Sequence, residues 1–494
     1  MLTDEIRRFF QSLTSNKQVV ELAVEIQQGL EKGNTAITAS SSKELLLDEL
    51  ISEDGNSGYI VQTDELAGFR RFYNSEVNIK QDFTLADIIE IDQHKLNQAI
   101  KEACHTLNIN IPSQEQLSQD KQWLATINFL QHRRYLVSGG PGTGKTTTVV
   151  RMLLLYGSLY PDYSIALAAP TGKAANRMMQ SINSLLPSNY QHKAQTLHRL
   201  LGYNHQKNSL KYNIENTLPY DLVIIDESSM LDTTMANALI NALKSKAQLL
   251  LIGDKNQLPA VEAGHVFADL CKISKENSIE LDKNYRFDTE SKIAQLCDCL
   301  IKQDSINFNK VNNYNNPKSQ QEKYNQLKQW YEGVGNDTAV LLSPIKQGKN
   351  SVEELNKMAM QILYKNNKLN EKMPIIVQHN DYTLGIFNGD IGTLNYTSEG
   401  WQVPFQISGE TKFIKLDAIK QWQVAHAITI HKSQGSEYDH VLVALPDDLE
   451  LEILTNQLLY TAISRAKKSI TIWSSKKIIE KIINTNATRM TFLN

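Results

Sequence analysis

The sequence has little cysteine, and this shortage excludes two kinds of covalent or metal-based scaffold. Four cysteines among 494 residues cannot form a disulfide framework, so we expect reduced thiols. The Cys297-x-Cys299 pair lacks the second pair that a zinc or cluster site needs, which favours a structural role for both residues.

The sequence also has a small net charge and only short apolar runs. With 51 basic against 54 acidic residues the net charge is −3, which excludes binding of nucleic acid through overall positive charge. No apolar run approaches the roughly 18 residues of a membrane span. The N-terminus mixes both charge signs and does not resemble a signal peptide. We therefore expect a soluble, cytoplasmic protein.

Charge is distributed unevenly along the chain, whose length predicts two to four domains. Residues 1–112 carry 10 basic and 18 acidic residues, a charge of −8, which leaves 41 basic and 36 acidic residues, or +5, for the remainder. We place a boundary at residues 111–113. Residues 4–30 and 84–107 have apolar side chains at helical spacing, which predicts a mainly helical N-terminal domain over residues 1–112.

The body of the chain alternates short apolar runs with helical patterns. Buried runs that alternate with helices indicate parallel sheets covered on both faces, so the predicted class is α/β. Two regions interrupt the alternation: residues 202–219 fit a β-hairpin, and residues 374–418 fit a small β-barrel insert. The apolar runs lie at residues 135–138, 165–169, 222–225, 249–252, 340–342, 427–430, 441–444 and 470–473.

A glycine-rich loop between a predicted strand and a predicted helix is the strongest local motif. Its glycines allow backbone N–H groups to turn inward, where the helix N-terminus adds partial positive charge. In such a phosphate loop the lysine bridges the outer phosphates of ATP and the following threonine binds Mg²⁺. The loop consists of Gly139, Gly140, Pro141, Gly142, Thr143, Gly144, Lys145 and Thr146.

Two carboxylates, Asp226 and Glu227, directly follow the apolar run at residues 222–225. Burying such a pair is costly unless the two groups serve a cation or a reaction. We expect Asp226 to hold Mg²⁺ and Glu227 to act as general base toward the attacking water.

Further blocks occur in an order that resembles superfamily 1 DNA helicases, and among them the RecD-like branch. The blocks at 387–392 and 429–437 carry the RecD-like character. All the blocks are residues 169–175 (APTGKAA), 196–202 (TLHRLLG), 253–259 (GDKNQLP), 284–287 (NYRF), 387–392 (FNGDIG), 429–437 (TIHKSQGSE) and 460–465 (YTAISR).

The resemblance implies roles for residues outside the phosphate loop. Gln257 would sense the γ-phosphate or position the water, while Arg286 and Arg465 would act as arginine fingers on the developing charge. Gln122 would read adenine, and Gly435 and Glu437 would couple nucleotide to DNA. For DNA contacts the candidates are Thr171, Lys173, Thr196, His198, Thr429, His431 and Ser433. For each of these polar residues a structural role is the alternative.

The implied fold has two RecA-like motor domains, at residues 113–290 and 291–494, with an SH3-like insert at about 374–418. The hairpin at 202–219 resembles a strand-separating pin, with Tyr203 or Tyr212 meeting the duplex end; a plain connecting hairpin is the alternative.

The implied function is an ATP- and Mg²⁺-dependent 5′–3′ DNA helicase that processes double-strand ends for recombinational repair, as the motor of an exodeoxyribonuclease V (RecBCD)-type machine. RecB-like and RecC-like subunits would be its partners, with the nuclease centre in the RecB-like one. The acidic N-terminal domain would dock a protein or, alternatively, form a solvated helical cap. A solitary helicase and an interaction subunit whose ATPase switches assembly are the competing hypotheses.

Overall fold

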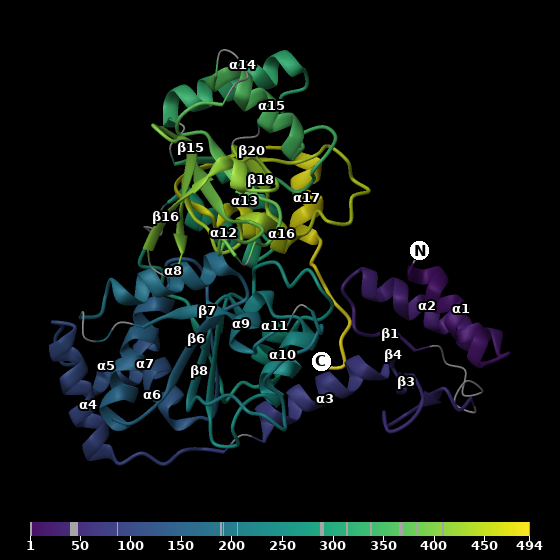
Figure 1. Ribbon diagram of the computed structural model, residues 1–494, viewed down its shortest axis with the longest axis vertical. Helices are drawn as coiled ribbons and strands as arrows, with labels where there is room; N and C mark the ends of the chain where they lie inside the picture. The colour runs from purple at the N-terminus through teal and green to yellow at the C-terminus, as the bar shows by residue number, and fades with distance from the viewer. Residues whose placement is uncertain are drawn as a thin grey trace.

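The computed structural model describes residues 2–39, 48–85, 87–187, 190, 192–204, 206–286, 291–312, 315–335, 338–364, 369–381, 383–407 and 410–493. Phe287 and the predicted boundary at residue 290 lie outside these ranges. Two α/β lobes, formed by the middle and the C-terminal part of the chain, face each other, and a smaller N-terminal unit lies beside the first (Figure 1). None of the helices in the described part of the chain has the length and apolar character needed to cross a membrane.

The N-terminal unit combines helices with a small sheet that the sequence did not predict. Helices α1 (Leu2–Leu13) and α2 (Lys17–Glu31) pack on a four-stranded sheet in the order β1-β4-β3-β2. These strands are only two to four residues long, which leaves little periodicity for a sequence pattern to reveal. They are β1 (Ile37–Thr38), β2 (Ile51–Ser52), β3 (Ile60–Gln62) and β4 (Leu66–Phe69), followed by α3 (Arg70–Thr84).

Helix α4 (Gln93–Thr106) lies before the predicted boundary at residue 112 but packs with the first lobe. Its apolar face, with Leu96, Ile100 and Cys104, shares a core cluster with α6 (Lys121–Gln131) and α7 (Lys145–Leu159). Asp92 caps this helix by accepting from two backbone N–H groups. By its packing, α4 is therefore part of the first lobe.

The first lobe contains a six-stranded, wholly parallel sheet in the order β10-β5-β9-β8-β6-β7. Buried apolar strands with helices between them produce this arrangement, as the sequence predicted. The strands are β5 (Arg134–Gly139), β6 (Ile165–Ala169), β7 (Ala194–Thr196), β8 (Leu222–Ile225), β9 (Gln248–Gly253) and β10 (Ser278–Leu281). The remaining elements are α5 (Gln114–Gln119), α8 (Gly172–Asn183), α9 (Leu197–Leu200), η3 (Ser228–Met230), α10 (Thr233–Asn241) and α11 (Val266–Ile273).

The second lobe contains a four-stranded parallel sheet in the order β18-β11-β19-β20. Its strands are β11 (Ala339–Ser343), β18 (Ala427–Thr429), β19 (Tyr438–Ala444) and β20 (Ala466–Trp473). Its helical elements are α12 (Lys292–Ile301), α13 (Ser305–Val311), α14 (Gln320–Val334), α15 (Val352–Leu363), η5 (His431–Ser433), α16 (Asn456–Ile463) and α17 (Lys476–Asn484).

The insert predicted at residues 374–418 is antiparallel β structure with a core of its own, which includes Ile375, Val403 and Phe405. It forms two three-stranded sheets, β13-β12-β17 and β14-β15-β16, and β17 lies beyond the predicted end at residue 418. The elements are β12 (Pro374–Val377), β13 (Ile391–Thr393), β14 (Asn395–Thr397), β15 (Gly400–Ile407), β16 (Glu410–Lys415), η4 (Leu416–Ala418) and β17 (Trp422–Val424).

The β-hairpin predicted at residues 202–219 is not formed as regular strands. The described residues of this segment contain one antiparallel bridge, between Asn204 and Ser209. Side-chain oxygens of Asn204 and Asn213 accept from nearby backbone N–H groups, so local turns compete with a strand ladder here.

The last residues return from the second lobe to the first lobe and the N-terminal unit, and we call residues 485–493 the C-terminal strap. It descends from α17 and ends beside α3 (Figure 1). Backbone N–H groups of Thr35 and Ala36 donate to the carbonyl oxygen of Met490. Leu493 is fully buried in the core of the first lobe. The strap thus fastens the two lobes and the N-terminal unit together.

Candidate nucleotide-binding cleft

The glycine-rich loop connects β5 to α7 and has the geometry of a phosphate cradle. Gly142 and Gly144 have φ angles of 79° and 83°, in the left-handed region that favours glycine. A Cβ at Gly144 would collide with the side-chain amide of Gln122. Lys145 Nζ donates to the carbonyl oxygens of Gly139 and Gly140, at 2.5 and 3.0 Å, so its charge lies within the loop.

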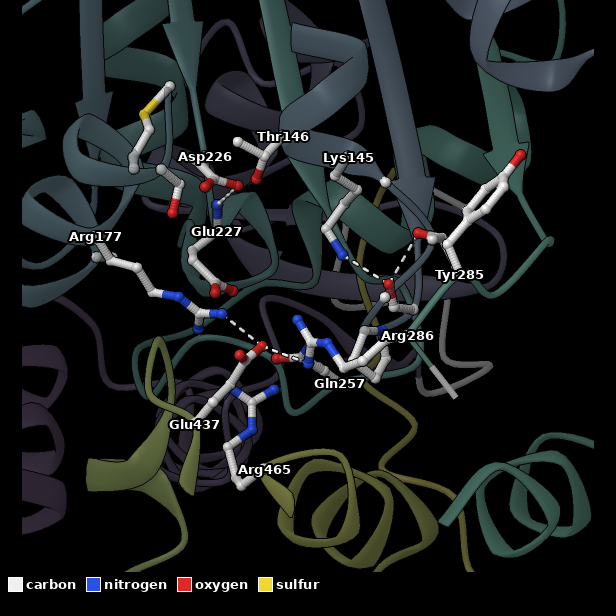
Figure 2. Close-up of a pocket in the computed structure, with 18 residues that line it drawn as sticks. Lys145, Thr146, Arg177, Asp226, Glu227, Gln257, Tyr285, Arg286, Glu437 and Arg465 are labelled. Atoms are coloured by element: carbon white, nitrogen blue, oxygen red, sulfur yellow. Dashed lines mark hydrogen bonds and ion pairs between the residues drawn. The ribbon is translucent and has the colours of Figure 1, made fainter. Parts of the chain in front are cut away.

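A cavity of about 280 Å³ opens beside this loop and is lined from both lobes. The first lobe contributes the loop and the end of β8, while the second contributes Glu437 and Arg465 (Figure 2). The cavity therefore combines cations, carboxylates and amide groups at the junction of two parallel sheets, the usual place for a ligand in such folds. Its lining comprises Gly140, Pro141, Gly142, Thr143, Gly144, Lys145, Thr146, Ala174, Arg177, Met178, Ser181, Asp226, Glu227, Gln257, Tyr285, Arg286, Glu437 and Arg465.

Asp226 and Glu227 occupy the turn at the end of β8. Glu227 has a φ of 53°, a left-handed value that is unusual for a non-glycine residue and that concentrates at functional sites. Its backbone N–H donates to Asp226 Oδ1 at 2.8 Å. Burial, followed by the charge of Glu227, raises the pKa of Asp226 to about 6.

Thr146 lies next to Asp226 in the cleft (Figure 2). A hydroxyl and a carboxylate are oxygen donors of the kind that Mg²⁺ takes, together with phosphate oxygens and water. A cation bound beside Asp226 would favour its ionised form, whereas burial raises its pKa. These residues therefore fit the predicted magnesium ion.

Glu437 lies between two arginines of the first lobe (Figure 2). Its Oε1 is 2.5 Å from Arg177 Nη2 and 2.7 Å from Arg286 Nη1. Burial alone would raise the pKa of Glu437, but the two guanidinium groups outweigh it and hold this pKa at about 2. The sequence analysis identified Arg286 and Glu437, but it missed Arg177.

Arg465 reaches the cavity from the end of α16. Its guanidinium donates to the carbonyl oxygens of Thr461 and Ser436 and to Ser464 Oγ, at 3.1 to 3.2 Å. The side chain is buried, with a relative exposure of 3% for the residue. These bonds hold the arginine in one orientation, as an arginine finger requires.

Gln122 lies behind the loop, where its Nε2 donates to the carbonyl oxygen of Thr143 at 3.1 Å. A second cavity adjoins it and is also lined by Lys121, Asp282 and Tyr285. Thr143 and Tyr285 line both cavities, so the two spaces adjoin. The adenine-reading role of Gln122 stays a prediction.

Two family models match the chain: an AAA domain at residues 122–263 and a UvrD-like helicase C-terminal domain at residues 424–472. The RecBCD enzyme subunit RecD of Haemophilus influenzae is 30% identical over 472 residues, covering 77% of this chain and 72% of that protein. The subunit of the same name in Mycolicibacterium smegmatis is 31% identical, covering 72% of this chain and 71% of that protein. The chain belongs to the RecD family.

The chain is also similar to two helicases with other names. The ATP-dependent RecD2 DNA helicase of Deinococcus radiodurans is 30% identical to this RecD-family chain, covering 68% of it and 46% of the longer relative. The solved structure of Pif1 helicase from Bacteroides with ADP-AlF3 and single-stranded DNA gives a TM-score of 0.45 at 19% identity. That match covers 73% of this chain and 94% of the Pif1 chain.

The DNA candidates of this RecD-family chain lie outside the nucleotide cavity, and several hydroxyl groups already have local partners. Thr171 and Thr196 cap α8 and α9 by accepting from backbone N–H groups. Thr429 accepts from Lys432 N, and the fully buried Ser433 donates to the carbonyl oxygen of Ile430. In this conformation the four hydroxyl groups make local hydrogen bonds, and their contacts with DNA stay predictions.

The other three candidates are ring or ammonium side chains. Lys173 Nζ lies 5.9 Å from the ring centre of Tyr438, across the junction of the two lobes. His198 contacts Tyr203 edge to face at 5.6 Å. Burial lowers the pKa of His431, so its neutral form is favoured. Their contacts with DNA stay predictions.

Among the cleft residues to which the sequence analysis gave no role, Arg177 lies just beyond a motif, and Tyr285 lies within one, the block at residues 284–287. Arg177 follows the 169–175 block by two residues, and on α8 it is one helical turn beyond Lys173. Tyr285 precedes Arg286. Helical spacing from the motif would have pointed to Arg177, whereas an aromatic residue beside an arginine carries little signal of its own.

Proposed function

We propose that this protein is an ATP-dependent DNA helicase, which uses ATP hydrolysis to move its two lobes relative to one another along a DNA strand. The observation that carries this proposal is the cavity, where a phosphate loop and two carboxylates from one lobe face Arg465 from the other. A site formed by both lobes lets nucleotide binding and hydrolysis change their relative position.

Each of the cleft residues would have its own role in ATP hydrolysis. Lys145, which bonds loop carbonyls here, would turn to the outer phosphates, and Thr146 with Asp226 would hold Mg²⁺, which neutralises phosphate charge when bound. Glu227 would accept the proton of the attacking water. Arg286 and Arg465 would stabilise the negative charge that develops on the transferred phosphoryl group.

The finer architectural assignments belong to the same proposal. Residues 113–290 and 291–494 would be RecA-like motor domains, the antiparallel insert would be SH3-like, and translocation would run 5′ to 3′. The seven DNA candidates would line the path of the single strand across both domains. The Deinococcus relative is named as a DNA helicase, which supports DNA as the substrate.

We further propose assembly with RecB-like and RecC-like subunits, the nuclease centre lying in the RecB-like one, for processing double-strand DNA ends. This chain covers 72% of a relative named as a RecBCD subunit but only 46% of the relative named as RecD2 helicase. The name of the first relative supports the subunit hypothesis, and the name of the second supports the solitary helicase. The −8 charge of residues 1–112 favours a protein partner over DNA for that unit.

Replacing Lys145 with Ala tests the catalytic proposal. We expect DNA-stimulated ATP hydrolysis to fall by at least about 100-fold, with an unchanged thermal unfolding midpoint, because the loop keeps its glycines. Lys477→Ala, on the exposed face of α17, is the matched control. Near-wild-type turnover in Lys145→Ala would refute the assignment.

Polarity and partners need separate experiments. Unwinding of 5′-tailed but not 3′-tailed duplexes would support the proposed direction, and the reverse preference would overturn it. Co-purification from native expression tests the partners. Full-rate unwinding by the isolated chain would favour the solitary helicase, and nucleotide-gated assembly without translocation would favour the switch.

A further inference from the structure

A buried hydrogen bond joins the two lobes behind the nucleotide cavity. Tyr460, on α16 of the second lobe, donates its hydroxyl to Asp254 Oδ2 at 3.0 Å, just after β9 of the first lobe. The two residues are 2% and 1% exposed. A Cβ on Gly140 would lie 2.9 Å from the Tyr460 hydroxyl, so this tyrosine also lies against the phosphate loop.

The same carboxylate oxygen of Asp254 holds Gln257. Gln257 Nε2 donates to Asp254 Oδ2 at 3.1 Å, while Asp254 Oδ1 accepts from the backbone N–H of Asn256 at 3.0 Å. An ionised carboxylate only accepts hydrogen bonds, so the amide nitrogen of Gln257 must face Asp254. The amide oxygen is thereby directed away from Asp254.

The amide oxygen of Gln257 is a buried acceptor. Within the described ranges Gln257 Oε1 has no hydrogen-bond partner, although the residue is only 5% exposed and lines the nucleotide cavity. Buried acceptors normally have a donor, so this one calls for a donor from the cavity side. A water molecule placed to attack the γ-phosphate would supply such a donor.

Two further bonds connect the segment after Gln257 to the second lobe. The backbone N–H of Leu258 donates to Thr461 Oγ1 at 2.9 Å, next to Tyr460 in the chain. Gln434 Nε2 donates to the carbonyl oxygen of Leu258 at 3.3 Å. The position of Gln257 in the first lobe is thus fixed from the second lobe.

We propose that Tyr460 and Asp254 are positioning residues, which direct the Gln257 amide oxygen at the attacking water only when the two lobes are in contact. The proposal rests on the proposed ATP hydrolysis at this site. In that reaction the water oxygen bonds to the γ-phosphorus as the bond to the bridging oxygen breaks. Glu227 takes one water proton, ADP leaves with the bridging oxygen, and Gln257 Oε1 accepts a hydrogen bond from the other water proton. Separation of the lobes removes the Tyr460 bond and leaves Gln257 without its fixed orientation.

Tyr460→Phe removes only the hydroxyl and keeps the ring in its core. We expect kcat of DNA-stimulated ATP hydrolysis to fall about tenfold, with KM for ATP within about twofold of wild type, because the lost bond orients a group used in the chemical step. The matched control is Tyr331→Phe, a buried tyrosine of the same lobe whose hydroxyl has no hydrogen-bond partner among the described residues. We expect wild-type kcat in the control.

A double-mutant cycle separates positioning from a merely structural role. In a Gln257→Ala background, Tyr460→Phe should cause almost no further loss of kcat, because the group that it orients is gone. Asp254→Asn should lower kcat at least as much as Tyr460→Phe, since an amide can present its own donor to Gln257. Thermal unfolding midpoints close to wild type would show that each variant is folded.

The outcomes are distinguishable from those of the proposed function. If the wild-type protein hydrolyses ATP and Tyr460→Phe retains full kcat, or if its loss adds fully to that of Gln257→Ala, the positioning proposal is wrong. A misfolded Tyr460→Phe would leave Asp254→Asn to decide: full kcat there overturns the proposal. If the wild-type protein has no ATPase activity, the proposed function itself fails.

Discussion

Glu437 pairs with Arg177 across the junction of the two lobes, with 2.5 Å between Oε1 and Nη2. The carboxylate is 12% exposed and the arginine side chain 37%, so water only partly screens this pair. Arg286 shares the same oxygen at 2.7 Å. In this conformation Glu437 thus neutralises two arginines that face the space beside the phosphate loop.

Replacement of Arg177 with Ala tests whether this arginine serves the nucleotide as well as Glu437. We expect KM for ATP to rise about tenfold, with a smaller effect on kcat, because the cleft loses a cation that would face phosphate charge. Glu437 would keep Arg286 as its partner, which should preserve the fold. ATPase kinetics provide the measurement, with Arg8→Ala on the exposed surface of α1 as control. An unchanged KM would assign Arg177 to the ion cluster alone.

From the buried carboxyl group of Glu76 we predict that the stability of the folded protein depends on pH. Glu76 is fully buried and accepts from Thr35 Oγ1, Thr233 Oγ1 and the backbone N–H of Phe492. Burial raises its pKa to about 7, despite these hydrogen bonds. The folded state therefore holds a proton that the unfolded chain releases at about pH 4.5. This contribution is full below pH 4.5 and is lost as pH rises through 7.

Glu76→Gln should remove this dependence. The two threonine hydroxyls can rotate to accept from the new amide nitrogen, while the amide oxygen accepts from Phe492 N. We expect the variant to be more stable than wild type at pH 8, by up to about 3 kcal/mol, with a difference that shrinks toward pH 5. Thermal unfolding midpoints from pH 5 to 8 supply the measurement. Parallel pH curves for the two proteins would contradict the prediction.

Local patterns in the sequence were sufficient to predict the features that are formed by residues close together in the chain. The glycine loop and the Asp226–Glu227 pair each lie within a few positions of a predicted strand, and the structure brings them to one cavity. Contacts between residues far apart in the chain had no such local pattern to indicate them. Tyr460 and Asp254 are 206 positions apart, and the strap contacts residues more than 400 positions away.

The differences between prediction and structure have the same origin. Residues 202–219 have turn-forming asparagines between polar residues, a composition shared by hairpins and irregular loops, and the local bonds of Asn204 and Asn213 favour the loop. In the N-terminal unit, strands of two to four residues depend on pairing with distant segments rather than on their own sequence.

From the lowered pKa of Lys173 we predict that single-stranded DNA binds more weakly at alkaline pH. Burial lowers its pKa to about 8, although Asp390 opposes this effect. Its positive charge, present below pH 8, is therefore lost between pH 7 and 9. We expect the affinity for an oligonucleotide to fall several-fold over that range, because one phosphate contact loses its charge.

Lys173→Arg supplies the matched comparison, since a guanidinium stays charged throughout this range. Fluorescence anisotropy at constant ionic strength should show a flatter pH dependence for the variant than for wild type. Identical pH profiles would remove Lys173 from the DNA path and leave it the structural role of contacting Tyr438.

Arg489 attaches the C-terminal strap to the first lobe, and we predict the effect of removing this attachment. Its guanidinium donates to the carbonyl oxygens of Ala260, Glu262 and Gly264 at 2.6 to 2.7 Å, in the loop that follows Gln257. Burial lowers the pKa of Arg489 to about 10, which still leaves it charged at neutral pH. Arg489→Ala would leave three carbonyl groups without this donor, a cost of about 2–4 kcal/mol.

The loss should appear first as local opening, because the strap ends in a core that other residues also stabilise. We expect faster amide hydrogen exchange in residues 33–36 and 260–264 of Arg489→Ala, with unchanged exchange in the four-stranded sheet of the second lobe. Arg489→Lys should give an intermediate result, since an ammonium can reach fewer of the three carbonyls in the same geometry. Uniform acceleration across the whole chain would instead mean that Arg489 supports global stability rather than the attachment of the strap.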